Sequence, residues 1–361
     1  MVATLDLSLD AVALTAAVCD IESVSLGEAA LADAIEAALA PLSHLHLTRI
    51  GNSLVARTEL GRAERVLIAG HIDTVPLTSE PANLPTTLVD GPGGAILRGR
   101  GTVDMKGGVA VMLRIAALVP EPNRDLTLVF YEAEEIDSQF NGLGLIEAAH
   151  PELITDAAFA VLMEPTDAAI EGGCKGTLRA EVTTKGIAAH SARPWKGHNA
   201  IHDAAGILDR LAAYEPRNVV VDGLEYREGL NAVRIAGGIA GNVIPDRCTI
   251  EINFRFAPDR TLTEAQAFVT DVFAGYDVEF TDLAPAARPG LDLPAAREFV
   301  DAVGGEPGPK YGWTDVARFA ELGVPAVNFG PGDPGKAHAD DEFCPVIDLH
   351  TCHDALLRWL G

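Results

Sequence analysis

A histidine and an aspartate end an apolar run in a way that could bind a metal ion. The stretch Val66 to Asp73 reads VLIAGHID, with His71 and Asp73 at its end and Pro76 shortly after it. Such a run is typical of a strand buried on both faces of a parallel sheet. Alternate strand residues share a face, so both side chains can point at one ligand at the carboxyl edge, where open α/β sheets bind ligands. The pattern predicts a metal site, although an isolated pair also fits a histidine that caps a loop beside an unrelated aspartate.

Further carboxylates and a second histidine follow other predicted strands. The apolar runs 126–131 and 158–163 end at acidic residues, the run 325–329 leads on to a histidine, and another aspartate precedes an apolar helix within 100–119. The candidate metal-site residues are His71, Asp73, Asp104, Glu134, Glu135, Glu164 and His338. Because crowded carboxylates raise one another's pKa, a divalent cation is the simplest way to neutralise them.

The residue types in this set indicate which metal would bind and how many ions. Two histidines with several carboxylates suit zinc, cobalt or manganese, whereas oxygen ligands alone would suit magnesium or calcium. The set is too large for one tetrahedral ion, and a bridging Asp104 would allow two ions about 3.5 to 4 Å apart. The adjacent Glu134 and Glu135 cannot point the same way from extended backbone, so we predict that one binds metal and the other activates water. On its own, the same pair would indicate a solvated acidic loop.

Composition limits the number of domains and the kinds of partner. A chain of 361 residues exceeds the usual size of a single core, so two domains are expected. The 52 acidic residues outnumber the 27 basic ones, and the net charge of -25 disfavours nucleic acid and anionic membranes as partners. The five cysteines lack CxxC spacing and are expected to be reduced. Since no apolar stretch approaches ~18 residues and no leader pattern precedes the first helix, we expect no membrane segment and a cytoplasmic location.

Hydrophobic periodicity predicts the elements that must position the candidate residues. Helical spacing marks 6–20, 25–40, 199–214 and 263–276, and strand alternation marks a hairpin in 44–57. The segment 76–99 is rich in turn-forming residues and is expected to be a long loop. Beyond residue 172 the strands alternate polar and apolar residues, which is typical of an antiparallel sheet with one solvated face. We predict an α/β fold with a mixed, mostly parallel sheet flanked by helices in 1–174 and 288–361, and an inserted α+β domain in 175–287.

Five segments resemble, in order and spacing, the dinuclear zinc aminoacylase and carboxypeptidase family, which includes acetylornithine deacetylases and desuccinylases. They read GHIDTVP, GRGTVDMKGG, YEAEEIDS, LMEPTD and FGPGDPGKAHADDE, and the resemblance covers nearly the whole chain. It implies two zinc ions, with cobalt or manganese as the other candidates. His71 and Glu164 would hold one ion, Glu135 and His338 would hold the other, and Asp104 would bridge them.

The resemblance also implies a mechanism of amide hydrolysis. Two cations would lower the pKa of a bridging water enough for hydroxide to form near neutrality and attack the amide carbonyl. Glu134 would take the proton from this water and pass it to the departing amine, while Asp73 would orient the His71 imidazole. The peptide bond after Asp104 would be cis. His190 would reach the active site of the neighbouring subunit in a homodimer built from the inserted domains, which would also act as a lid; by residue type alone, His190 also fits a surface or hydrogen-bonded histidine.

The segments EGGCKGTLR and KYGWTDVARF are most similar to the desuccinylase branch of the family. This similarity implies N-succinyl-LL-2,6-diaminopimelate, a precursor of lysine and meso-diaminopimelate, as the substrate. Its three carboxylates would require a local positive pocket in such an acidic protein. Candidate substrate-binding residues are Lys175, Arg179, Asn242, Arg255 and Thr314. Lys175, where arginine is common in the family, and Trp313 beside Thr314 depart from the family pattern.

Two kinds of alternative remain open at this stage. Within the same family, the chain could be an acetylornithine deacetylase or another N-acyl-amino-acid hydrolase or carboxypeptidase. From a different class, it could bind metal without catalysis, but Glu134 argues against this because such a site needs no unligated base.

Overall fold

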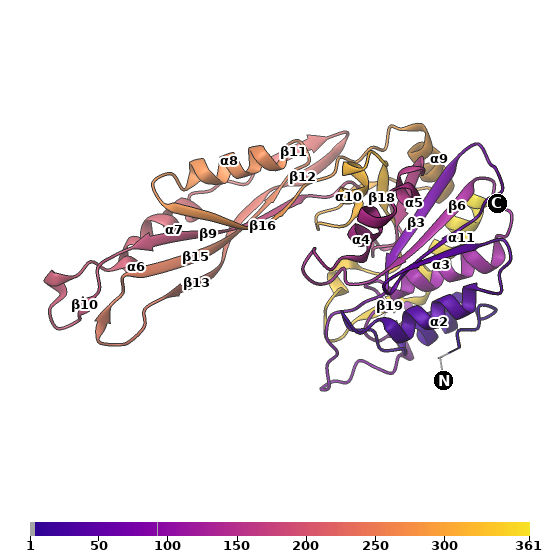
Figure 1. Cartoon of the computed structure of the whole chain (residues 1–361), viewed down its shortest axis with the longest axis horizontal. Coiled ribbons are helices and arrows are strands. Elements are labelled where there is room, and N and C mark those ends of the chain that lie inside the picture. Colours follow the sequence, from indigo (N-terminus) through magenta and orange to yellow (C-terminus); the bar gives the residue numbers. More distant parts are fainter. Residues whose placement is uncertain (1–3, 92) are drawn as a thin grey trace. The chain divides into compact units, whose positions relative to one another are not determined.

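The structure is a computed structural model that describes residues 4–91 and 93–361, and these residues form two compact units (Figure 1). The first unit contains the described residues up to Gly172 together with Gly290–Gly308 and Thr314–Gly361, and the second contains Gly173–Pro289 and Pro309–Trp313. The sequence prediction assigned 309–313 to the first domain. These residues cluster with the second unit instead, where the Lys175 ammonium lies 5.2 Å from the centroid of the Tyr311 ring.

A mixed sheet forms the centre of the first unit. Among the described residues it has eight strands, in the order β1-β2-β6-β3-β7-β18-β8-β17. Their bounds are β1 His46–Ile50, β2 Ser53–Arg57, β3 Arg65–His71, β6 Asp125–Tyr131, β7 Phe159–Leu162, β8 Glu171–Gly172, β17 Gly308–Pro309 and β18 Ala326–Asn328. The central strands β6, β3, β7 and β18 are parallel, and β1 and β2 form the predicted hairpin. The predicted α/β fold class is therefore confirmed, and the carboxyl ends of the parallel strands meet at one edge.

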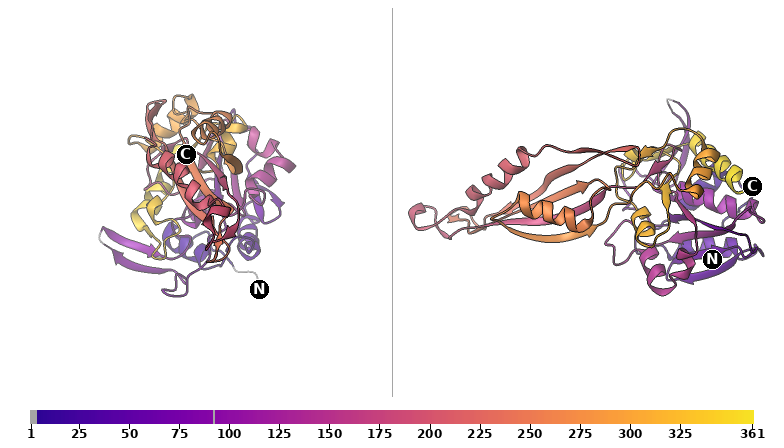
Figure 2. Two further views of the ribbon diagram at one scale, coloured as in Figure 1. Left: turned by 90° about the vertical axis from the view of Figure 1, so that its left-hand side faces the viewer. Right: turned by 90° about the horizontal axis from the view of Figure 1, so that it is seen from above.

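Helices from distant parts of the chain share one core with this sheet. They are α1 Ala11–Cys19, α2 Ala29–Leu39, α3 Lys106–Leu118, α9 Pro294–Val303 and α11 Val346–Leu360. Figures 1 and 2 show the yellow α11 beside the magenta α3, although the two are far apart in the sequence. Val66 and Ile68 of β3 face this core, while Leu67 and Ala69 point to the opposite face and are also buried. This burial on both faces is what the apolar run predicted. The remaining helices of the unit are α4 Gly142–Ala149, α5 Glu152–Thr155, α10 Val316–Glu321 and the 3-10 helix η2 Pro334–Lys336.

The segment 76–99 is not the structureless loop that its composition predicted. It contains β4 (Thr87–Gly91) and β5 (Gly94–Arg98), which form an antiparallel hairpin. β5 also pairs with β19 (Phe343–Pro345), more distant in the chain. The loop prediction was wrong for these strands because β4 is mostly exposed and β5 is only partly buried, so neither strand shows the alternation of apolar and polar residues that marks a half-buried strand.

The second unit is built on an antiparallel sheet with helices on one face. Within the described part of the chain, the sheet has the order β13-β15-β9-β16, with β9 Gly176–Lys185, β13 Gly229–Gly237, β15 Arg247–Phe256 and β16 Asp277–Ala284. Ile250, Ile252 and Phe254 of β15 point into a core shared with α6 Ala200–Asp203, α7 Ala205–Ala212 and α8 Leu262–Val272. Short elements complete the unit: β10 Ala189–His190 with β14 Val243–Ile244, β11 Asn218–Val221 with β12 Leu224–Arg227, and the 3-10 helix η1 Pro194–Lys196. The helix predicted over 199–214 is thus two consecutive helices.

Two expectations from composition can be compared with the structure. All five cysteines are buried thiols. A search of residues 4–91 and 93–361 identifies no helix with the length and apolar character needed to cross a membrane.

Candidate metal centre and active site

His71 is the last residue of β3, and its ring is held from both nitrogens. Its Nδ1–H donates to the Asp73 backbone carbonyl at 3.1 Å, and the Asp73 Oδ1 lies 3.4 Å from the same nitrogen. Because a carbonyl oxygen can only accept, Nδ1 carries a proton and Nε2 is left to face the Asp104 Oδ1, at 3.1 Å. Both His71 and Asp73 have no exposed surface. Buried neighbours therefore orient the imidazole toward Asp104.

Asp104 lies between two histidines that come from opposite ends of the chain. Its Oδ2 is 3.2 Å from His338 Nε2, and the same nitrogen is 2.9 Å from Glu135 Oε2. Ligand atoms of His71, Asp104 and Glu135 all lie within 4.8 Å of one another. The two imidazoles hold the pKa of Asp104 well below its ordinary value, since their hydrogen bonds outweigh the burial of the carboxyl group. One carboxylate with a histidine at each oxygen is an arrangement that fits a pair of bridged cations.

The loop after β6 presents the adjacent Glu134 and Glu135, and two buried carboxylates hold its backbone. Glu134 N–H donates to Asp73 Oδ1 at 3.0 Å, and Glu135 N–H donates to Asp73 Oδ2 at 3.2 Å. Ala133, which has a φ of 57°, donates its N–H to Glu28 Oε1 at 3.2 Å. Asp73 therefore fixes the glutamate loop as well as approaching the His71 ring, a second contact that the sequence did not indicate.

Glu134 has the electrostatic environment of an acid–base group. Burial raises the pKa of its carboxyl group well above the ordinary value; His71 opposes this shift, and the carboxylates of Glu164 and Asp315 add to it. A glutamate with a raised pKa can both take up and release a proton near neutral pH. The oxygens of the neighbouring Glu135 are directed at His338.

Glu164 follows β7 at the same sheet edge and is 7% exposed. The preceding Met163 carbonyl is approached closely by two glycines. A Cβ on Gly108 would lie 2.6 Å from that oxygen, and one on Gly330 would lie 2.3 Å from it. Only glycine allows the start of α3 and the loop after β18 to pack this tightly around the base of Glu164. The cis peptide implied after Asp104 is present in the structure.

The candidate substrate-binding residues of the second unit fall into two groups. Lys175, Arg179 and Arg255 lie near one another around β9 and β15: burial and Arg255 lower the pKa of Lys175, and burial and Arg179 lower the pKa of Arg255. Asn242 and His190 lie beyond the other end of β9, where the Ser191 N–H donates to the Asn242 carbonyl. Since β9 has ten residues, the two groups are about 30 Å apart. Within this unit, Asn242 therefore lies far from Lys175 and Arg255, and the substrate-binding roles of all three stay predictions.

Thr314, in the first unit, is 4% exposed, and its hydroxyl donates to Asn328 Oδ1 at 2.8 Å. Trp313, in the second unit, donates its indole N–H to the Pro285 carbonyl at 3.1 Å. The Thr314 hydroxyl proton is thus engaged inside the protein, and its role in substrate binding stays a prediction.

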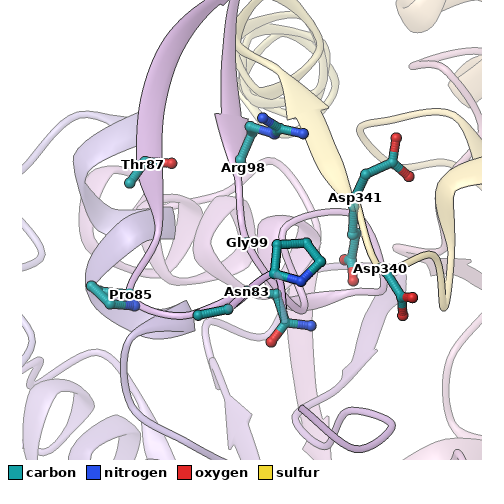
Figure 3. A pocket seen from close by; sticks show the side chains of 10 residues that line it. Asn83, Pro85, Thr87, Arg98, Gly99, Asp340 and Asp341 are labelled. Carbon is teal, nitrogen blue, oxygen red and sulfur yellow. The ribbon is translucent and has the colours of Figure 1, made fainter. Parts of the chain in front are cut away.

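A separate cavity of about 140 Å³ lies beside the loop that follows His338 (Figure 3). Pro85, Thr87 and Arg98 line it on one side, and Asp340 and Asp341 line it on the other. None of the seven candidate metal-site residues is among its lining residues. The cavity therefore does not contain the cluster around Asp104, but it adjoins it through Glu342, which is one of the lining residues.

A unit with a mostly parallel sheet, a second unit with an antiparallel sheet, and a cluster of histidines and carboxylates at a strand edge define a class of protein. Sequence comparison identifies that class. The profile of the peptidase family M20/M25/M40 matches residues 67–361, so the chain belongs to this family. A Mycobacterium tuberculosis protein provisionally named succinyl-diaminopimelate desuccinylase DapE is 53% identical over 99% of both chains. The succinyl-diaminopimelate desuccinylase of Corynebacterium glutamicum is 47% identical over 99% of this chain and 98% of its own.

Solved structures share the fold over nearly the full length. A tripeptidase of Staphylococcus aureus has a TM-score of 0.78 at 21% identity, covering 99% of this chain and 98% of its own. A dinuclear metal binding peptidase of Bacillus subtilis has a TM-score of 0.68 at 15% identity, covering 97% and 96%. At these identities the comparison establishes the fold.

Some residues that organise the site escaped the sequence reasoning. Ser25, Glu28 and Glu342 have side chains that contact Asp73, the glutamate loop and the backbone of Asp104, respectively. Arg100 acts at one remove, because its side chain contacts Glu342. Arg100 and Glu342 lie inside two of the motif segments, and this position could have indicated that they are near the site. Ser25 and Glu28 lie outside every motif, and only the folded chain brings them to the site.

Proposed function

We propose that this chain is a metal-dependent amide hydrolase that releases succinate from N-succinyl-LL-2,6-diaminopimelate. The observation that carries the proposal is the placement of Asp104 between His71 and His338, with the raised-pKa Glu134 beside them. The two relatives named as desuccinylases support the choice of substrate, because they match this chain over essentially its whole length.

The residues at the sheet edge suit two divalent ions, most readily zinc, with cobalt or manganese also compatible. His71 and Glu164 would hold one ion, Glu135 and His338 would hold the other, and Asp104 would contribute one oxygen to each. When bound, the ions supply positive charge that polarises an amide carbonyl and makes water more acidic.

The chain's own residues account for the proton transfers of hydrolysis. Glu134 would accept a proton from the attacking water and then give it to the nitrogen of the departing amine as the C–N bond breaks. Its raised pKa lets it hold that proton between the two steps. Asp73 would keep Glu134 in place through the backbone N–H bond at 3.0 Å. Water and amide are consumed and an acid and an amine are formed, so no further reactant is required.

Recognition of the substrate carboxylates would fall to the second unit. Lys175, Arg179 and Arg255 form a local group of positive charge in a protein of net charge -25. Guanidinium groups bind carboxylates through paired hydrogen bonds, which suits a tricarboxylate. Because His190 and Asn242 lie at the far end of the unit, we propose that they serve the site of a second chain in a homodimer.

A substrate panel tests this proposal. Zinc-loaded protein should release succinate from N-succinyl-LL-2,6-diaminopimelate with a kcat/KM at least about tenfold higher than for N-acetylornithine or for dipeptides. Preference for N-acetylornithine or a dipeptide would assign the chain to another activity of the family. A protein that binds metal but hydrolyses none of these compounds would refute the enzymatic assignment.

A further inference from the structure

Glu342 is a buried carboxylate that holds the backbone of Asp104. The residue is 2% exposed, and its Oε1 accepts the Val103 N–H at 2.9 Å and the Asp104 N–H at 3.2 Å. Both N–H groups precede the start of α3 and have no place in a helix ladder. The position of Asp104 is thus set by a side chain from the other end of the sequence.

Arg100 connects this carboxylate to the backbone beside His338. Its Nη1 donates to Glu342 Oε2 at 2.8 Å and to the Ala339 carbonyl at 3.2 Å. Arg100 is 3% exposed, and the preceding Gly99 N–H donates to the Glu342 carbonyl at 3.0 Å. His338 itself has a φ of 63°, and the carbonyl that Arg100 holds belongs to Ala339, the next residue along the chain.

The Arg100–Glu342 pair therefore links the two segments that meet at the metal centre. Glu342 binds the N–H of Asp104, and Arg100 binds the carbonyl of Ala339, the residue after His338. The Oδ2 of Asp104 and the Nε2 of His338 lie 3.2 Å apart. We propose that Arg100 and Glu342 are positioning residues that set the separation of Asp104 and His338, and with it the affinity for the ion on the His338 side. This inference rests on the proposed function only in assuming that these residues bind metal.

The charges of the pair favour positioning over general stabilisation. A buried ion pair is weak support for stability, because the cost of removing two charges from water offsets much of their attraction. Groups that orient metal ligands, in contrast, change metal affinity or activity by about 10- to 100-fold when they are altered. The two roles can be separated by measuring metal binding and folding on the same variants.

The test uses Glu342→Gln, Arg100→Lys and the control Asp125→Asn. Asp125 is also a buried carboxylate that accepts two backbone N–H groups, from Leu60 and Arg62 at 2.8 Å each, but it begins β6 at the edge opposite the site. Zinc is titrated calorimetrically into chelator-treated full-length protein, and near-UV circular dichroism confirms that each variant is folded. We expect Glu342→Gln to bind one ion within about twofold of wild type and the second ion about 10- to 100-fold more weakly. Asp125→Asn should bind both ions as wild type does.

Wild-type binding of both ions by Glu342→Gln, or an equal weakening in Asp125→Asn, would overturn the inference. If Glu342→Gln does not fold, Arg100→Lys decides the matter. Both hydrogen bonds come from Arg100 Nη1. A lysine keeps the charge, but its ammonium ends one bond short of that position and cannot hold Glu342 and Ala339 in the same way, so weaker binding of the second ion is expected. Two wild-type sites in Arg100→Lys would then overturn the inference. Because zinc binding is the readout, a protein that releases no succinate refutes the proposed function without altering this result.

Discussion

Glu134 and Glu135 are adjacent residues of one type that lie in different environments. The loop after β6 turns at Ala133, and the backbone N–H groups of both glutamates are bound by the Asp73 carboxylate. Glu135 is directed at His338, whereas Glu134 is surrounded by groups that favour its protonated form. Residue type alone does not distinguish the two carboxylates, but their environments differ, and this difference supports the proposed division into a base and a metal ligand.

A first prediction concerns Glu134→Gln. Glutamine has the same shape but cannot accept a proton, so we expect kcat to fall by about 10²- to 10⁴-fold while both ions remain bound. Succinate release and metal content measure the two effects. The matched control is Glu132→Gln, two residues earlier, where the side chain bonds Asn52 outside the site and activity should change little. Near-normal turnover by Glu134→Gln would show that another group is the base.

A second prediction concerns the pH dependence of the metal-free protein. Hydrogen bonds to Asp104 and Glu135 raise the pKa of His338 to about 10, above the usual value of about 6.5 for histidine. The stabilisation from protonated His338 is complete below about pH 6.5 and is lost as the pH rises toward 10. In thermal unfolding of chelator-treated protein, the wild type should therefore be more stable than His338→Gln at low pH, and this difference in stability should disappear across this range. Zinc affinity should increase over the same range, because the ion must displace the proton. Parallel pH profiles for the two proteins would contradict the prediction.

At the scale of elements, buried carboxylates bind the backbone of the loops at one edge of the sheet. Asp73 binds the glutamate loop, Glu342 binds the loop before α3, and Glu28 at the start of α2 binds Ala133. Such loops have backbone N–H groups with no partner in helices or strands, and each needs an acceptor once it is buried. The carboxylates therefore stabilise loop conformations that the hydrogen bonds of helices and strands do not determine.

A third prediction follows for Glu28, which has no exposed surface. Its Oε1 accepts the N–H groups of Leu26 and Ala133, and burial raises the pKa of the carboxyl group. Glu28→Ala leaves both N–H groups without this acceptor and should lower the free energy of unfolding by about 2 kcal/mol or more. Glu28→Gln keeps the accepting oxygen and is neutral, so it should cost much less. Urea denaturation of the two variants measures the difference, and equal losses would show that cavity volume, not the lost acceptor, governs this site.

At the scale of the whole molecule, the second unit separates two groups of candidate residues along β9. Lys175, Arg179 and Arg255 lie at one end, and His190 and Asn242 lie at the other. A rigid strand of this length cannot bring both groups to one small ligand within the unit. A symmetric homodimer would give the distant group a site to serve on the second chain.

A fourth prediction tests this arrangement by complementation. His190→Ala and Glu134→Gln should each be inactive alone, because each removes one component from every site. After the two proteins are unfolded together and refolded as a mixture, up to about a quarter of wild-type activity should return, since half of the dimers are mixed and each has one complete site. Refolding each variant separately is the control. An inactive mixture that contains mixed dimers would show that His190 acts within its own chain or not at all.

The sequence by itself determined the fold class, the strands that end at the site and the set of histidines and carboxylates at their ends. These features are local, because the hydrophobic pattern that predicts a buried strand is a property of consecutive residues such as Val66 to His71. Tertiary structure decided which acids meet which backbone groups. Nothing in the spacing of Glu28, Arg100 or Glu342 shows that they bind Ala133, Ala339 and Asp104, because those pairings depend on N–H and carbonyl groups that remain unsatisfied only after the loops are buried. The pairing of β5 with β19 and the separation of Asn242 from Lys175 have the same origin, since both depend on contacts between segments that are distant in the chain.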